Sequence, residues 1–192
     1  MKLKQIFLTT FAAFLLLCVT LSCSDSFLDE KMFSNYGPEV KDTNAKLIGL
    51  HRQFAAIWGW SGRQGFVGCW QVGTDIGSPG DTEGVEVPFY RYQELNAENG
   101  AVNFLWERLY AIINSSNQII SSLSESEDSS EKAEGMFFRA YADNMLVTLW
   151  GKVPLVIEST TVPKTDYVRE EIAKVDELID NDLSFAITHL PA

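Results

Sequence analysis

The sequence predicts a mainly α-helical protein built from helical hairpins. In four separate segments, apolar residues recur at steps of three and four positions, which places them along one face of a helix. These segments cover about half of the chain after residue 22, above the roughly one third that is typical of globular proteins. The long segment between the first two helices lacks this period and is rich in glycine and aromatic residues. We therefore expect helical hairpins with one long loop excursion.

Composition excludes several classes of function. The 192 residues carry 26 acids against 15 bases, a formal net charge of -11. A nucleic-acid-binding surface needs clustered Lys and Arg, so nucleic acid is not an expected partner. Three cysteines without Cys-x-x-Cys spacing rule out a disulfide framework, and two distant histidines supply few parts for a zinc site or a catalytic triad. No cofactor and no metal are expected.

The first 22 residues are expected to be a lipoprotein signal peptide. Lys2 and Lys4 precede an uncharged apolar stretch over residues 6–21, which is the pattern of a secretory signal. Such a stretch is shorter than the roughly 20 residues of a permanent span. The Ser22-Cys23 pair then resembles a bacterial lipobox, in which the signal is cut before the cysteine and its thiol is acylated. We predict lipidation at Cys23; an ordinary cleaved signal and an uncleaved anchor are the alternatives.

Cleavage before Cys23 divides the chain into three parts. Residues 1–22 are the signal peptide, residues 23–42 form a lipidated polar tether, and residues 43–192 form the helical domain. The removed part holds two lysines and no acid, so the net charge changes from -11 to -13.

The first predicted helix begins at Thr43 or Asn44, because either side chain can cap a helix N-terminus. Gly59 ends it. Its apolar stripe consists of Leu47, Leu50, Phe54 and Ile57. From Gly59 to Gly100 the helical period disappears, and a loop of this length is uncommon in a compact domain unless it has a function.

The second and third helices are expected to form an antiparallel hairpin. The second covers residues 101–123, with a stripe of Leu105, Leu109, Ile112, Ser116, Ile119 and Leu123. Asp128 and Glu131 have the spacing of a capping box for the third. That helix ends at Gly151, and its stripe is Ala133, Phe137, Ala140, Asn144 and Val147.

An extended connector over residues 151–156 follows, because Pro154 cannot continue a helix. The fourth helix is predicted to begin near Thr165 or Asp166 and to end at Pro191. Its stripe is Val168, Ile172, Val175, Ile179, Leu183, Ala186 and Leu190.

An ordered set of motifs resembles the N-terminal portion of the SusD/RagB family of outer-membrane lipoproteins. The set begins with the lipobox and Ser24-Asp25-Ser26-Phe27-Leu28-Asp29. It continues with Trp106-x-x-x-Tyr110-x-x-Ile113-x-x-Ser116-Asn117, Glu131-x-Ala133-Glu134-Gly135-x-Phe137-x-Arg139-Ala140, Leu149-Trp150-Gly151-Lys152-Val153-Pro154-Leu155, and Val175-x-x-Leu178-Ile179-x-x-Asp182-Leu183-x-x-Ala186-x-x-x-Leu190-Pro191.

The resemblance implies a tetratricopeptide-like scaffold whose loops capture glycans or other nutrients. It also implies a partner, a TonB-dependent SusC-type transporter, and a location on the outer membrane through the acylated Cys23. Family members are typically more than twice as long, so the sequence is expected to hold a truncated version of the family's scaffold. A structural or adaptor lipoprotein that docks on the transporter without binding ligand is the alternative.

The loop between the first two helices supplies the predicted ligand contacts. Sugars are bound by flat aromatic faces together with planar polar groups, and this stretch holds both types. The candidates are Trp58, Trp60, Trp70, Asp75, Tyr90, Arg91 and Tyr92. Large aromatics also pack loops onto helices, and core packing is the expected role of Trp106, Tyr110, Phe137 and Trp150. Asp75, Asp81 and Glu83 lack the spacing of a calcium loop, and no arrangement of residues predicts an enzyme.

Overall fold

The computed structural model describes residues 42–58, 70–80, 84–123, 129–160, 162 and 164–191. They belong to one compact unit, Lys41–Ala192. Five helices lie in these ranges: α2 (Thr43–Trp58), α4 (Val87–Arg91), α5 (Gly100–Ser122), α6 (Ser130–Trp150) and α7 (Ile172–His189). The described ranges contain no sheet, only an isolated bridge between Pro154 and Arg169. The prediction of a mainly α-helical protein is confirmed.

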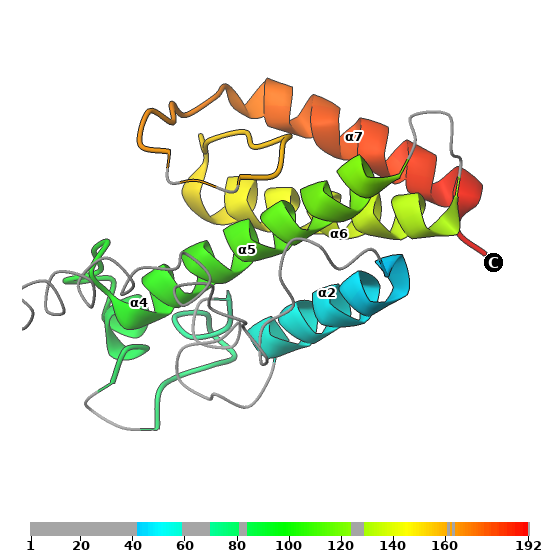
Figure 1. The fold of residues 1–192 in the computed structure, drawn as a ribbon. Coiled ribbons are helices and arrows are strands. Elements are labelled where there is room, and N and C mark those ends of the chain that lie inside the picture. The colour runs from blue at the N-terminus through cyan, green and yellow to red at the C-terminus, as the bar shows by residue number, and fades with distance from the viewer. Residues whose placement is uncertain are drawn as a thin grey trace, which may run out of the picture. The chain divides into compact units, whose positions relative to one another are not determined.

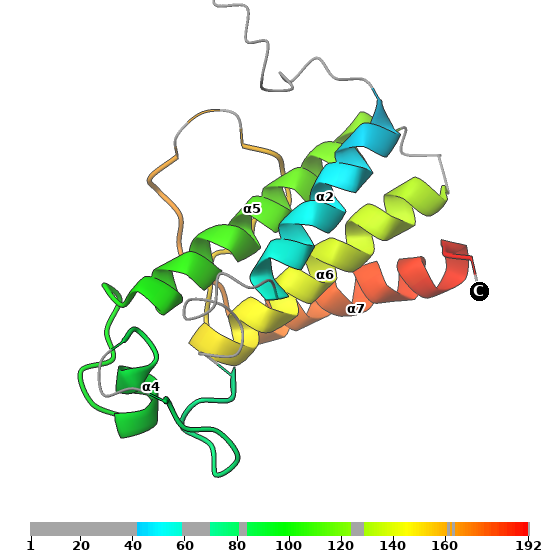
Figure 2. The same cartoon turned by 90° about the horizontal axis from the view of Figure 1, so that it is seen from below.

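Helix α6 lies at the centre of the bundle. It packs against α5 on one side and α7 on another, and α2 covers both α5 and α6 (Figures 1 and 2). The core between these helices is aliphatic, and its fully buried side chains include Leu50, Ile57, Leu105, Leu109, Ile112, Ile119 and Leu146. None of the described helices is long and apolar enough to span a bilayer.

Helices α2 and α5 form as their apolar stripes predict. Leu47, Leu50 and Ile57 of α2 are buried. All the predicted α5 positions from Leu105 to Ile119 are buried as well. The α2 cap differs from the prediction: the carboxylate of Asp42 accepts from the backbone N–H groups of Asn44 and Ala45. The N-cap is therefore Asp42, one residue before the predicted Thr43, and its carboxylate accepts hydrogen bonds from the N–H groups of the first turn.

The stripe predicted for α6 is wrong in part. Ala133 and Ala140 are buried, but Asn144 is exposed and Phe137 keeps 38% of its surface accessible. The residues that fill the core instead include Phe138, Met145 and Leu146. The reason is that α6 contacts three helices, so its buried surface is wider than the single stripe of a helix packed on one side.

Both ends of α6 are defined by local geometry. The hydroxyl of Ser129 accepts from the N–H of Lys132 at 3.2 Å, so Ser129 is the N-cap. The predicted cap, Asp128, lies outside the described residues. Gly151 follows the last helical residue with φ +71°, a left-handed conformation that favours glycine, as its predicted role requires.

The last helix begins later than predicted. The described residues between α6 and α7, which are 152–160, 162 and 164–171, are called the strap. Its two ends pair with each other: the N–H of Glu170 donates to the carbonyl of Val153 at 2.9 Å. This pairing holds residues 165–171 outside the helix, so Val168 is 75% exposed instead of buried. Ile172 is also exposed, at 41%. From Val175 onward the prediction holds, because Val175, Ile179 and Ala186 are buried.

Candidate ligand-binding site

The predicted ligand residues lie in different settings. Trp58 ends α2 with 44% of its surface exposed, and its ring packs near those of Phe54 and Tyr141, with centroids 6.3 and 6.5 Å away. Trp70 is partly buried against the core. Cys23 and Trp60 lie outside the described residues, as do Asp81 and Glu83.

Four of the predicted residues lie on the short helix α4, directly after it, or in the turn that contacts it. Asp75 is exposed in a turn over residues 71–77, and Tyr90 and Arg91 are exposed at the end of α4. Tyr92 follows in a left-handed conformation, φ +53°, and is 78% exposed. Its hydroxyl donates to the carbonyl of Gly73 in the turn. We call the turn, α4 and Tyr92 together the tyrosine platform.

Gly73 makes the tyrosine platform compact. Its φ is +94°, and a Cβ at this position would lie 2.6 Å from the carbonyl oxygen of Phe89. Only glycine permits both the conformation and the close approach. The turn is further closed by Gly73 N–H donating to the carbonyl of Gly77 at 3.3 Å. Sequence reasoning did not anticipate α4, although Pro88 stands in its first turn, where proline is well tolerated.

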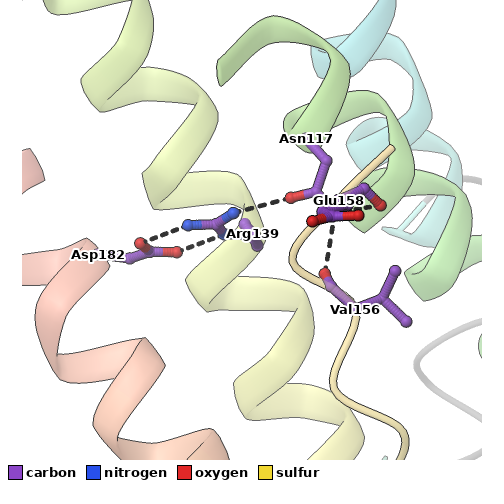
Figure 3. Close-up of polar contacts among 5 residues, drawn as sticks. All are labelled: Asn117, Arg139, Val156, Glu158 and Asp182. Carbon is purple, nitrogen blue, oxygen red and sulfur yellow. Dashed lines mark hydrogen bonds and ion pairs between the residues drawn. The ribbon is translucent and has the colours of Figure 1, made fainter. Parts of the chain in front are cut away.

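A chain of buried polar contacts joins α7, α6, α5 and the strap (Figure 3). Arg139 of α6 donates to both carboxylate oxygens of Asp182 on α7, at 2.7 and 2.8 Å. Its remaining terminal nitrogen donates to the amide oxygen of Asn117 on α5 at 2.8 Å. The amide nitrogen of Asn117 donates in turn to the carbonyls of Val156 and Glu158 in the strap, at 2.9 and 3.2 Å.

Two more side chains on the same side of α5 hold the strap. The hydroxyl of Tyr110 donates to the carbonyl of Pro154 at 2.9 Å. The amide oxygen of Asn114 accepts from the N–H of Thr160 at 2.7 Å. Tyr110, Asn114 and Asn117 are spaced by four and three positions, so they share one face of the helix.

A pocket of about 390 Å³ lies between α5 and the strap. This volume is at the small end of the range for ligand pockets. The pocket is lined by Trp106, Glu107, Tyr110, Asn114, Pro154, Val156, Thr160 and Tyr167. Trp106 and Tyr110 pack against the hydrophobic core, as predicted, but they also line this pocket, which sequence reasoning missed. The available signal was the spacing of Trp106, Tyr110 and Asn114, which forms a second, more polar stripe beside the aliphatic one.

One buried acid is left without a partner beside these contacts. Asp143 of α6 has no exposed surface, and neither carboxylate oxygen has a hydrogen-bond partner among the described residues. Burial raises the pKa of Asp143 to about 7; the positive charge of Arg139 opposes this rise, and the negative charge of Asp182 adds to it. Asp143 therefore keeps its proton to a higher pH than an ordinary aspartic acid does.

The described residues present two notable features: exposed tyrosines on the compact tyrosine platform, and an aromatic pocket between α5 and the strap. No group of three or more His, Cys, Asp or Glu in the described part of the chain is arranged to hold a metal ion.

Comparison with known proteins identifies the family. Residues 80–192, more than half of the chain, match the SusD-like family described as "Starch-binding associating with outer membrane". The chain belongs to this family, whose members are non-catalytic binding proteins. No curated protein matches the sequence.

A solved structure has the same fold. It is a crystal structure with a xylogluco-oligosaccharide, and it aligns with a TM-score of 0.60 at 20% sequence identity. The alignment covers 78% of this chain and 30% of the other. The expected relationship to the SusD-like proteins and the helical fold are thus confirmed, and the chain spans about a third of the length of that protein.

Proposed function

We propose that the chain captures glycans or other nutrients at the outer membrane for uptake through a TonB-dependent SusC-type transporter. The family description, starch binding in association with the outer membrane, supports this role. So does the xylogluco-oligosaccharide present with the structurally similar protein. Both point to a carbohydrate as the first ligand class to test.

The tyrosine platform is the observation that carries the proposal. Tyr90 and Tyr92 are 48% and 78% exposed, although aromatic rings gain most when buried. Tyr90 lies on α4 and Tyr92 directly follows it, and the turn over residues 71–77 approaches α4 closely at Gly73. A preorganised aromatic surface binds with less loss of conformational entropy than a flexible loop does. Asp75 and Arg91 supply planar polar groups in the same unit.

Affinity electrophoresis against a glycan panel that includes starch and xyloglucan tests this function. The wild-type chain should be retarded by at least one polysaccharide, and Tyr90→Ala and Tyr92→Ala should remove most of the retardation. Phe137→Ala is the matched control, since it also truncates a partly exposed aromatic residue but on α6. If retardation persisted in both tyrosine variants, the ligand would bind at a site other than the tyrosine platform. No retardation by any glycan would favour the adaptor role.

Lipid anchoring and the transporter partner are separate parts of the proposal. Metabolic labelling with a fatty-acid analogue should mark the wild-type chain and fail to mark Cys23→Ala; continued labelling would refute the site.

The transporter partner is tested separately. Capture of the lipidated chain from detergent-solubilised outer membranes should recover a large TonB-dependent β-barrel protein. Recovery of that partner by a chain without glycan binding would be the signature of the adaptor.

A further inference from the structure

The pocket between α5 and the strap has a lining of unusual composition. Three of its eight lining residues are Trp106, Tyr110 and Tyr167, and its one charged residue is Glu107. No Lys, Arg or His lines it. The rings of Trp106 and Tyr110 lie 4.9 Å apart with their planes tilted by 57°, so they form adjoining walls instead of a parallel stack.

The polar groups of the lining are already engaged within the protein. The Tyr110 hydroxyl donates to Pro154, and the Asn114 amide oxygen accepts from Thr160. The hydroxyls of Thr160 and Tyr167 pair with each other at 3.1 Å. A sugar ring needs several partners for its hydroxyl groups, and displacing these contacts would leave backbone groups of the strap unpaired. The pocket is therefore poorly suited to a sugar.

The remaining chemistry favours a positive charge. Glu107 forms no hydrogen bond or ion pair with any other described residue, so its carboxylate is available to a ligand. Burial and the negative charge of Asp143 raise the pKa of Tyr110, and the positive charge of Arg169 opposes this rise with a smaller effect than that of Asp143. The rings add the negative potential of their faces, which attracts cations.

The strap already shows this interaction at the edge of the pocket. The ammonium group of Lys164 lies 5.1 Å from the centre of the Tyr167 ring, within the range of a cation–π contact. Tyr167 is 41% exposed, so its ring is accessible to solutes as well as to Lys164.

We propose that this pocket binds a compact organic cation, a quaternary or alkylated ammonium group, with Trp106, Tyr110 and Tyr167 as its aromatic walls and Glu107 as its counter-charge. The site is distinct from the tyrosine platform and does not depend on glycan binding. Such a cation could be a free solute or the headgroup of a lipid, and the test below separates the two.

Titration calorimetry of the full chain with choline tests the proposal. Choline should bind saturably with a Kd on the order of 1 mM. Its uncharged carbon isostere, 3,3-dimethyl-1-butanol, should bind at least about tenfold more weakly, because it fills the same volume without the charge. Equal binding of the two compounds, or the absence of saturable choline binding, would overturn the proposal.

Two variants assign the site within the chain. Trp106→Leu should abolish choline binding, and Glu107→Gln should weaken it several-fold and reduce its dependence on salt. Phe137→Leu and Glu177→Gln are the matched controls and should leave binding unchanged. Trp106→Leu also removes the packing of Trp106 against Trp150, so Glu107→Gln, a change at an exposed residue, is the decisive variant. Unchanged choline affinity in Glu107→Gln would contradict the proposed counter-charge.

The source of the cation is resolved by flotation with phosphatidylcholine vesicles. Co-flotation of the unlipidated chain that is lost on adding free choline would assign the site to a lipid headgroup. Choline binding without co-flotation would assign it to a free solute. If glucose bound tightly and Trp106→Leu abolished its binding, the pocket would be a sugar site, and the proposal of an organic cation would be overturned.

Discussion

The guanidinium of Arg139 pairs edge to edge with the carboxylate of Asp182, through two hydrogen bonds of 2.7 and 2.8 Å. Both residues are almost completely buried, with 6% and 1% of their surface exposed. They join α6 to α7. This planar, two-bond geometry is specific to arginine, and Asn117 occupies the nitrogen that Asp182 leaves free. The pair and the amide therefore connect α5, α6 and α7 through one guanidinium group.

Breaking this pair from one side should be costly. In Arg139→Met the carboxylate of Asp182 stays buried without a partner, and we expect the free energy of unfolding to fall by about 3–5 kcal/mol. Urea unfolding followed by circular dichroism measures the change. The double variant Arg139→Met/Asp182→Leu removes both charges and should recover much of the loss. A single variant as stable as the wild type would mean that the pair is not a buried ion pair in solution.

Removing the Asn117 side chain should loosen the strap more than the bundle. Asn117→Ala frees the carbonyls of Val156 and Glu158, at an expected cost of about 1–3 kcal/mol. Hydrogen exchange at residues 153–160 should accelerate, whereas exchange in the middle of α6 should follow only the loss of global stability. Gln118→Ala, an exposed position on the same helix, is the control. Equal acceleration in all helices would show that Asn117 acts on the whole fold.

The buried Asp143 should make stability depend on pH. Its pKa is about 7 in the folded chain, against 3.8 when unperturbed, so the folded state holds this proton to a higher pH than the unfolded chain does. The free energy of unfolding should therefore fall as pH rises from about 4 to about 7, then level off, with a total change of at most about 4 kcal/mol.

Asp143→Asn isolates this contribution. The amide cannot ionise, so the difference in stability between wild type and Asp143→Asn should shift in favour of the variant as pH rises from 5 to 8. Asp176→Asn, an exposed acid on α7, is the control and should show no such trend. A wild type that gains stability relative to Asp143→Asn over this range would contradict the raised pKa.

Gly73 should be irreplaceable in the tyrosine platform. In Gly73→Ala the added Cβ meets the Phe89 carbonyl, and the backbone must also hold a left-handed φ, at a cost of about 1–3 kcal/mol for the conformation. The near-ultraviolet tyrosine signal and glycan retardation should both decrease. Gly49→Ala on α2 is the opposite case, since nothing lies within 4 Å of its Cβ, and it should raise stability by up to about 1 kcal/mol.

Helix positions could be predicted from the sequence where one face of a helix is buried. The stripes of α2 and α5 follow a single apolar face, and Gly151 marks the end of α6 by its own conformational preference. The prediction was wrong for α6, because a helix enclosed by three others has no single buried stripe. It was also wrong for the start of α7, because pairing between Val153 and Glu170 keeps an apparently helical segment extended.

The candidate sites were likewise predicted only in part from the sequence. The sequence indicated an aromatic loop, and Tyr90, Arg91 and Tyr92 are exposed at the end of α4, next to the turn that holds Asp75; their binding role stays a prediction. The pocket was missed because half of it consists of strap residues, 44 and 46 positions away from Tyr110 and Asn114. Pairings over such a distance leave no local pattern. The aromatic residues of the pocket on α5 resembled ordinary core residues in the sequence, because their spacing along the helix does not reveal which part of the chain covers them.

The strap also has a consequence for the order in which the molecule assembles and opens. Helices α5 and α6 are separated by only seven residues and pack as neighbours, so their contacts close a short loop and form early. The strap contacts span 39 to 46 positions and depend on side chains that the docked helices must first position. We therefore expect the strap to close last in folding and to detach first in native fluctuations. A solute can then enter and leave the pocket by sub-global opening, while the helical core remains folded.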